Sequence, residues 1–189
     1  MANLHFYYGV MGSSKSAKLI IEAYNLRKNG NQVEIIKPAF DTRFSATHVK
    51  SRAGNLSVDA VAVPNMEEYK LKPGTQFLLV DEVQFFMPSD IDKMVYFADE
   101  KDIHVFCYGL KVDSNGHLFP AAQRLFEVSA TPHQLESNCQ INGCMHRATH
   151  HLRFDSNGNV IRAGERFVLG DSNYKSVCRE HFNQIYHGR

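Results

Sequence analysis

The residues best suited to chemistry near the N-terminus form the segment 9–16, Gly-Val-Met-Gly-Ser-Ser-Lys-Ser. This segment matches the phosphate-binding loop pattern G-x-x-x-x-G-K-[ST] at every fixed position but one, because Ser14 replaces the last glycine. In such a loop, backbone N–H groups surround the phosphates, a lysine neutralises their oxygens and a hydroxyl binds Mg²⁺. Lys15 and Ser16 provide these two side chains. A Gly/Ser-rich turn before an amphipathic helix is the plain alternative for this segment on its own.

Two adjacent carboxylates, Asp81 and Glu82, follow the apolar run Phe77–Val80. Ligands of open α/β sheets bind at the carboxyl ends of the strands, so Asp81 is expected beside the phosphate loop, where it can help hold Mg²⁺. Glu82 is then expected near the transferred phosphoryl group, where a carboxylate can orient a hydroxyl nucleophile or accept its proton. Solvated acids in a turn are the alternative when this pair is considered without the loop.

Three of the four cysteines lie in the last third of the chain and are spaced like metal ligands. Two pairs, C-x4-C and C-x2-H, predict a zinc site whose ligands are Cys139, Cys144, Cys178 and His181. Four protein ligands leave no open position, so the zinc is expected to be structural. Unpaired reduced thiols are one alternative, and another histidine as fourth ligand is a second: His146, His150 or His151. Cys107 lies in an apolar run, where a free thiol behaves as a small buried apolar residue.

The phosphate loop needs a strand before it and a helix after it. The aromatic-rich segment 4–8 predicts a short buried strand. Apolar residues near helical spacing predict a helix over 17–27, closed by Asn29-Gly30, and 33–36 predicts a second strand. This order of elements favours a parallel α/β sheet.

Further elements are expected to complete the sheet. Residues 75–80 and 103–108 contain apolar runs typical of strands buried on both faces. Segment 87–90 is expected to start a helix that continues over 91–98, with Ser89 as its candidate N-cap. Residues 42–74 show weak periodicity and are expected to be loop-like.

The sequence pattern of the chain changes near Ser137. From there, Asn-Gly turn pairs separate short strand-like pieces at 149–154 and 166–169. We therefore expect an α/β nucleotide-binding domain at residues 1–136 and a small β-rich, zinc-binding domain at residues 137–189.

Composition narrows the class of protein further. The chain has 189 residues, of which 43% are hydrophobic and 22% charged, which fits one main folded core and excludes intrinsic disorder. The net charge of +1 provides no strong field toward nucleic acid or an anionic membrane. The sequence shows neither a membrane-spanning apolar run nor a signal peptide, so a cytoplasmic location is expected. The four cysteines are too few and too unevenly placed for a disulfide framework.

In combination, these motifs resemble the thymidine kinases of the type shared by bacteria and the vertebrate cytosol, from Leu4 to about His181. The order and spacing of short segments carry this resemblance: the loop 9–16, Asp41-Thr42-Arg43, 81–86, 107–110, Leu118-Phe119, the paired zinc ligands and 170–179. The resemblance implies a P-loop NTPase-like parallel sheet with helices on both faces, plus the zinc-binding domain. It also implies a kinase that moves the γ-phosphoryl of ATP to the 5′-hydroxyl of thymidine, giving dTMP in nucleoside salvage for DNA synthesis.

The resemblance further implies roles for individual residues. Glu82 is the general base, and Ser16 and Asp81 serve Mg²⁺. The ATP and phosphate site comprises Gly9, Val10, Met11, Gly12, Ser13, Ser14, Lys15, Ser16, Arg43, Asp81 and Gln84. The nucleoside site comprises Met11, Phe85, Leu110, Phe119, Val168 and Tyr174, under a lasso-like loop at about 163–177 that the zinc module holds. Members of the family are typically homotetramers.

Two departures from the family pattern concern Ser14, where glycine is usual, and Ser114, where an aromatic residue is common. The first is expected to weaken nucleotide binding and the second to loosen the base pocket. A deoxynucleoside kinase of other specificity is one alternative function, because small changes in an apolar pocket are worth only about 1–3 kcal/mol. A nucleotide-gated zinc-ribbon module that binds nucleic acid is the alternative from another class, although the chain has no clustered Lys/Arg stripe.

Overall fold

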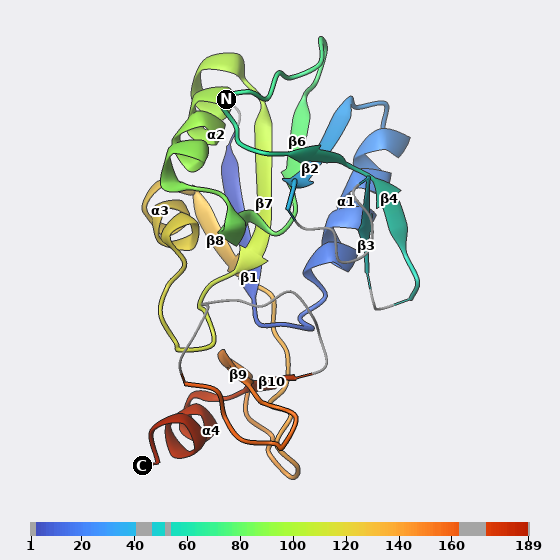
Figure 1. The fold of residues 1–189 in the computed structure, drawn as a ribbon. Helices are drawn as coiled ribbons and strands as arrows, with labels where there is room; N and C mark the ends of the chain where they lie inside the picture. Colours follow the sequence, from blue (N-terminus) through green and yellow to red (C-terminus); the bar gives the residue numbers. More distant parts are fainter. Residues whose placement is uncertain (1–2, 41–46, 52–53, 163–172, 189) are drawn as a thin grey trace.

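The computed structural model describes residues 3–40, 47–51, 54–162 and 173–188, and it centres on one parallel β-sheet (Figure 1). The sheet has six strands in the order β5-β2-β6-β7-β1-β8, and all neighbouring strands are parallel. In that order they are β5 (Val61–Val63), β2 (Val33–Pro38), β6 (Phe77–Val80), β7 (His104–Leu110), β1 (Leu4–Gly9) and β8 (Thr131–Gln134). The strands predicted at 4–8, 33–36, 75–80 and 103–108 are thus confirmed as β1, β2, β6 and β7.

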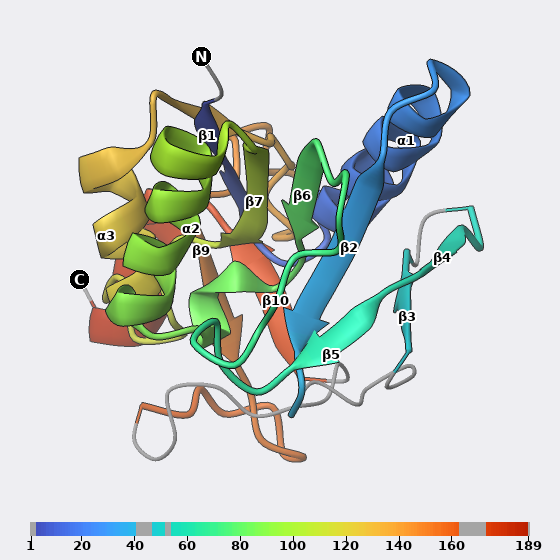
Figure 2. The ribbon, with the colours of Figure 1, turned by 90° about the horizontal axis from the view of Figure 1, so that it is seen from above.

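Helices cover both faces of the sheet, as expected (Figure 2). Helix α1 (Lys15–Lys28) packs Leu19 and Ala23 against one face, on Ile35, Leu79 and Tyr108. Helices α2 (Pro88–Lys101) and α3 (Pro120–Val128) cover the other face. There Ile91, Met94 and Leu125 belong to the cluster that includes Phe6, Leu78 and Val80. Successive residues of β6 therefore point into opposite cores, which is why its sequence is continuously apolar.

Helix α2 begins within the predicted start segment 87–90, but Ser89 is not its N-cap. The helix starts at Pro88, with Met87 in the extended cap position. Proline suits the first helical position because its ring presets φ and it has no N–H group to satisfy. Asp90 fulfils the capping role instead, since its carboxylate accepts hydrogen bonds from the N–H groups of Met87 at 2.8 Å and Met66 at 2.7 Å.

Part of the region 42–74 is regular, in contrast to the expectation of a loop. The strands β3 (His48–Lys50) and β4 (Ser57–Asp59) form an antiparallel pair, and β5 extends the edge of the main sheet beside β2. Each of these strands has only three residues. Alternation over three residues is too short to separate a strand from a loop, so the sequence pattern missed them.

A buried carboxylate holds the chain between β5 and β6 against the sheet. Glu34 on β2 accepts hydrogen bonds from Tyr69 Oη at 2.7 Å, from the N–H of Lys72 at 2.7 Å and from Thr75 Oγ1 at 2.5 Å. Burial, together with the bond to Glu34, raises the pKa of Tyr69 far above its usual value. Segment 69–75 is thereby fixed at the amino ends of β2 and β6, away from the phosphate loop.

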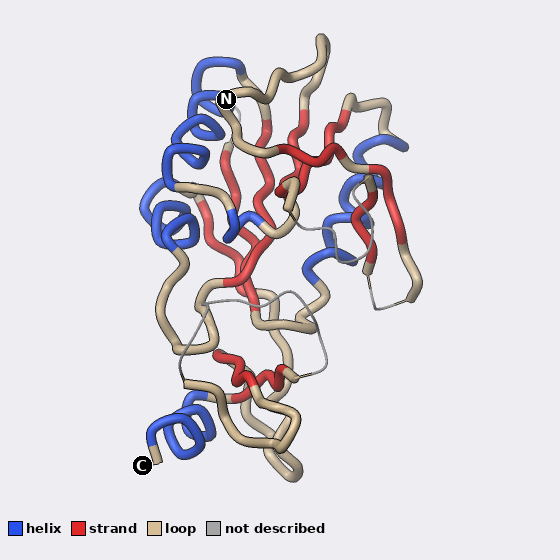
Figure 3. The backbone as a smooth tube through the Cα atoms, viewed as in Figure 1, coloured by secondary structure: helices blue, strands red, loops and turns tan. Residues whose placement is uncertain are grey.

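The C-terminal part forms a small module beyond the carboxyl ends of the strands (Figures 1 and 3). Its antiparallel pair is β9 (His150–Arg153) with β10 (Tyr174–Val177), followed by α4 (Arg179–Phe182) and the π-helical turn η2 (Asn183–His187). The strand predicted at 149–154 is β9, whereas the piece at 166–169 lies outside the described residues. The domain division at 136/137 stays a prediction. In the part of the chain that the structure describes, no helix has the length and apolar character to cross a membrane.

Candidate active site and metal centre

The loop 9–16 connects the end of β1 to the start of α1, so the first N–H groups of the helix face the loop. Helix α1 begins at Lys15. The ammonium group of Lys15 donates to the carbonyl oxygen of Val10 at 2.7 Å and lies 3.4 Å from Ser13 Oγ. The lysine thus lies within the loop whose backbone N–H groups would surround a phosphate.

Ser14, the departure from the glycine pattern, adopts a glycine-like backbone conformation. Its φ is 61° and its ψ is 26°, in the left-handed region, and Gly12 also has a positive φ of 75°. An L-residue with a Cβ adopts this conformation at a cost of about 1–2 kcal/mol. Glycine is therefore preferred at this position because of the backbone conformation. The chain keeps that conformation here although Ser14 carries a Cβ.

The carboxylate pair lies at the carboxyl end of β6, and the first acid meets the loop. Ser16 Oγ donates to Asp81 at 3.2 Å from Oδ2 and 3.4 Å from Oδ1. Asp81 is buried, and this burial, followed by the negative charge of Glu82, raises its pKa to about 7. Lys15 and the Ser16 hydroxyl oppose that rise. A buried carboxylate beside a hydroxyl fits Mg²⁺, because both are hard oxygen ligands and the cation would offset the unfavourable negative charge.

Gln84 holds the second acid in place. Its amide nitrogen donates to Glu82 Oε2 at 2.5 Å, and its amide oxygen accepts from the N–H of Leu110 at 2.9 Å. A Cβ on Gly109 would lie 2.6 Å from this amide oxygen, so only glycine fits beside it. The phosphate-binding role predicted for Gln84 stays a prediction, and in this structure its amide is engaged by Glu82 and the end of β7.

Four residues predicted to surround the nucleoside come together in one apolar cluster. Leu110 and Phe119 are buried in it, and Met11 and Phe85 pack against it. The rings of Phe85 and Phe119 meet edge to face at 6.0 Å between centroids. This places an apolar wall next to Glu82 and the phosphate loop.

The remaining nucleoside and phosphate predictions fall on or near the C-terminal module and the region after β2. Tyr174 begins β10 and turns its ring toward His151, with 5.8 Å between the centroids. Arg43, Val168 and segment 163–172 of the expected lasso lie outside the described residues.

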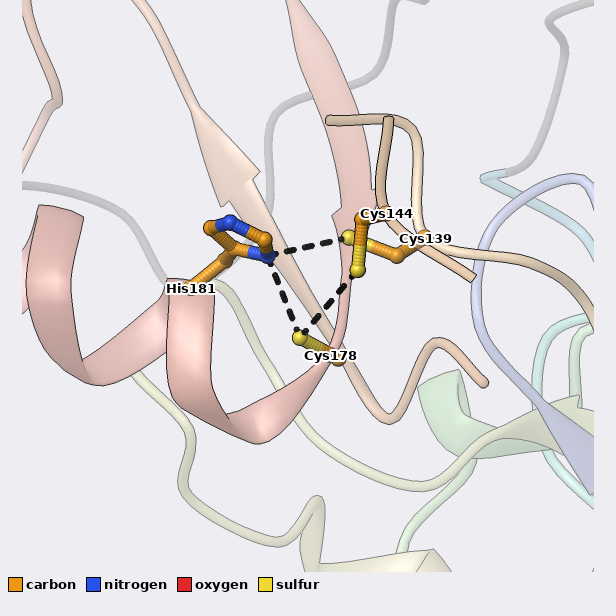
Figure 4. A group of neighbouring side chains, drawn as sticks. All are labelled: Cys139, Cys144, Cys178 and His181. Carbon is orange, nitrogen blue, oxygen red and sulfur yellow. Dashed lines mark hydrogen bonds between the residues drawn. The ribbon is translucent and has the colours of Figure 1, made fainter. Parts of the chain in front are cut away.

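The four predicted zinc ligands form one cluster (Figure 4). Their ligand atoms all lie within 4.8 Å of one another. Sγ of Cys139 and Sγ of Cys178 lie 3.5 Å and 3.2 Å from Nδ1 of His181, and the Sγ atoms of Cys144 and Cys178 are 4.0 Å apart. Tetrahedral zinc with bonds of about 2.0–2.3 Å needs ligand atoms roughly 3.5 Å apart, so the cluster fits this ion.

The three alternative histidines stand outside this cluster. His146 is exposed near Glu180, with 3.7 Å between Nδ1 and the carboxylate. His150 stacks on Phe182 at 4.4 Å between ring centroids, and His151 is buried beside Tyr174. His181 is therefore the histidine that completes the set, and none of the four cysteines, all of which the structure describes, forms a disulfide.

Sequence reasoning missed the residue that ties the metal module to the phosphate loop. Ser176 on β10 donates its hydroxyl hydrogen to the carbonyl oxygen of Met11 at 2.7 Å. These two residues are 165 positions apart. No local pattern signals such a bond, because it depends on where the module docks.

Strand β1, the loop with Lys15 and helix α1 follow one another in the chain, and the carboxylate pair lies at the end of another parallel strand of the sheet. This arrangement defines a P-loop nucleotide-binding protein. A model of the thymidine kinase family matches residues 2–182. A thymidine kinase of Rhodopirellula baltica is 35% identical to this chain, over 100% of this chain and 92% of that protein. The thymidine kinases of Legionella pneumophila (strain Lens) and Enterobacteria phage T4 are 34% and 30% identical, covering 97% and 98% of this chain and 90% and 97% of their own lengths. The chain belongs to the thymidine kinase family.

Proposed function

We propose that the protein transfers the γ-phosphoryl group of ATP to the 5′-hydroxyl of thymidine, giving dTMP for nucleoside salvage and DNA precursor synthesis. One observation carries this proposal: the bond from Ser16 to Asp81 brings the phosphate loop and the carboxylate pair into one site. The names of the curated relatives support the choice of thymidine as acceptor.

In this proposal, each charged residue has one task. Lys15 and the N–H groups of the loop bind the ATP phosphates, with Arg43 as a further phosphate contact. Glu82 accepts the proton of the 5′-hydroxyl, because a sugar hydroxyl is a poor nucleophile and the carboxylate aligns it. Gln84 keeps that carboxylate in position through the 2.5 Å bond.

Ser16 and Asp81 would hold Mg²⁺, which when bound neutralises phosphate charge. We assign a structural zinc to the Cys139, Cys144, Cys178 and His181 cluster, because four protein ligands close the coordination sphere. The metal would stabilise the C-terminal module, including Ser176, and through it the contact with Met11.

The nucleoside is proposed to lie on the apolar wall formed by Met11, Phe85, Leu110 and Phe119. Tyr174 contacts it from the C-terminal module, and Val168 belongs to the lasso proposed to cover the base. In this reading residues 1–136 form the nucleotide-binding domain and residues 137–189 the zinc and lasso domain.

We also propose a cytoplasmic homotetramer that acts on free nucleosides and binds neither nucleic acid nor membrane. Exposed apolar side chains on α1, Ile21 at 51% and Tyr24 at 63%, support an interface between copies of the chain. Cysteines that are not in disulfides suit a reducing compartment. Light scattering of the wild type and Tyr24→Glu tests the assembly, and a wild-type monomer contradicts it.

The function is tested by ADP release with ATP and each of thymidine, deoxyuridine and deoxycytidine. We expect thymidine to give the highest kcat/KM, and Lys15→Ala to remove nearly all turnover because its charge has no substitute in the loop. Preference for another nucleoside would establish the alternative deoxynucleoside kinase. ATP turnover that no nucleoside stimulates would instead favour the nucleic-acid-binding module.

A further inference from the structure

One histidine of the C-terminal module is buried with both ring nitrogens unpaired. His151 on β9 is 1% exposed, and in the described part of the chain neither Nδ1 nor Nε2 has a hydrogen-bond partner. Buried polar side chains are almost always hydrogen-bonded, because an unpaired one loses its water without compensation. A residue kept in this state is a candidate for bonding to a ligand.

The neighbours of His151 place it beside the substrate site. It is paired across the β9–β10 ladder with Ser176, whose hydroxyl bonds to the carbonyl oxygen of Met11 at 2.7 Å. The edge of its ring meets Tyr174 at 5.8 Å between centroids. It also lines a pocket of about 60 Å³ together with residues that include Gly9 and Val10 of the phosphate loop. The unpaired ring thus contacts the tyrosine assigned to the nucleoside and shares a pocket with the first residues of the phosphate loop.

The charge state of His151 indicates which part of a substrate its ring can bind. Burial, followed by the positive charge of Lys15, lowers the pKa of His151 to about 3, although Asp113 opposes the shift. The ring is therefore neutral near pH 7, with one nitrogen that donates and one that accepts. Phosphate oxygens only accept and are best held by cations, so a neutral ring is a weak partner for them, whereas its donor and acceptor can both pair with the uncharged polar groups of a nucleoside.

We propose that His151 is a specificity-determining residue that hydrogen-bonds the nucleoside through its ring nitrogens. This inference rests on the proposed function, and it adds a contact that the sequence analysis considered only as an alternative zinc ligand. The adjacent His150 provides a matched control, because its ring stacks on Phe182 and its Nδ1 lies 2.9 Å from Thr149 Oγ1.

Steady-state kinetics of His151→Leu, His151→Gln and His150→Gln test the inference, with thymidine and ATP varied separately. We expect His151→Leu to raise KM for thymidine about five- to tenfold, the loss of one hydrogen bond, and to change KM for ATP less than twofold. His151→Gln should recover much of the loss, since its amide also donates and accepts. His150→Gln should change neither KM more than twofold, and all three variants should retain the zinc content of the wild type.

Parallel assays with deoxyuridine and deoxycytidine locate the contact. If His151→Leu raises KM equally for all nucleosides, the ring contacts the sugar, and if it raises KM unequally, the ring contacts the base. An unchanged thymidine KM in zinc-loaded His151→Leu would overturn the inference, as would an equal rise in KM for ATP.

A second test needs no variant. In the wild-type chain with ¹⁵N-labelled histidine, the ring signals of His151 should shift when thymidine is added to the ADP-bound protein, beyond any change that ADP alone produces through the neighbouring phosphate loop. An active kinase whose His151 signals do not respond to thymidine overturns this inference and leaves the proposed function intact. A wild type that phosphorylates no thymidine overturns the proposed function itself.

Discussion

Gln84 links Glu82 to the end of β7 through both ends of its amide. The nitrogen donates to Glu82 Oε2 at 2.5 Å, and the oxygen accepts from the N–H of Leu110 at 2.9 Å. Gln84 is only 2% exposed, so its own position is set by the surrounding core. The carboxylate proposed as the base is therefore held at the carboxyl edge of the sheet, next to Asp81.

Replacing Glu82 by glutamine keeps the size of the side chain and removes the proton acceptor. We expect kcat of Glu82→Gln to fall on the order of 10²–10⁴-fold, with thymidine binding nearly unchanged, because the carboxylate acts in the transition state. Turnover assays and calorimetric titration measure the two effects. Glu100→Gln, an exposed position on α2, is the matched control. Turnover close to that of the wild type in folded Glu82→Gln would exclude Glu82 as the base.

The left-handed backbone of Ser14 predicts opposite outcomes for two small substitutions. Ser14→Gly relieves strain of about 1–2 kcal/mol, less the entropy that glycine gains in the unfolded chain, so stability should rise modestly. KM for ATP should fall several-fold or stay level. Ser14→Ala keeps the strain and loses the hydroxyl, so it should show no such gain. Urea unfolding compares the two, and equal stability would mean that φ at this position carries no penalty.

The proposed zinc site predicts a difference between two histidines of the same module. His181→Gln should abolish stoichiometric zinc and weaken thymidine binding, because metal binding is coupled to folding of the small module. His146→Gln should retain about one equivalent, since His146 lies outside the cluster. Elemental analysis of protein purified without chelator measures both. A wild type with less than about half an equivalent would refute the zinc assignment.

The buried neutral His151 predicts a pH dependence of stability. Its pKa is about 3 when folded and near 6.5 when exposed, so below pH 6.5 the unfolded chain binds the proton more readily. When the pH is lowered from 7 to 5, the free energy of unfolding of the wild type should therefore decrease by about 1–2 kcal/mol more than that of His151→Leu. Urea unfolding at both pH values measures this difference. Parallel pH curves for the two proteins would show that the ring takes up its proton without unfolding.

Glu34 predicts a stability effect separate from the active site. Glu34→Leu leaves the Tyr69 hydroxyl, the Lys72 N–H and the Thr75 hydroxyl without their acceptor, which should lower the free energy of unfolding by roughly 3 kcal/mol or more. Because this network lies at the amino ends of the strands, kcat of the folded fraction should stay near the wild-type value. A change in unfolding free energy no larger than that of Glu100→Gln would show that the network contributes little.

Several features could be predicted from the sequence because they depend on neighbouring residues. The apolar run Phe77–Val80 predicts a strand buried on both faces, and the two acids that follow it must then lie at its carboxyl end. Within a closely spaced pair of predicted metal ligands, such as Cys178 and His181, one short turn of chain brings the two side chains together. The loop 9–16 likewise needs only a strand before it and a helix after it.

Contacts between distant segments could not be predicted and are seen only in the folded chain. The sequence left four histidines open as the fourth ligand, and the docking of α4 beside Cys139 brought His181 into the cluster. The burial of His151, the bond from Ser176 to Met11 and the hold of Gln84 on Glu82 depend on side-chain directions that no spacing encodes. The chemical groups and the local turns that carry them follow from the order of residues along the chain. The packing of the module against the sheet determined which of these groups meet, because contacts between distant residues form only when the whole chain folds.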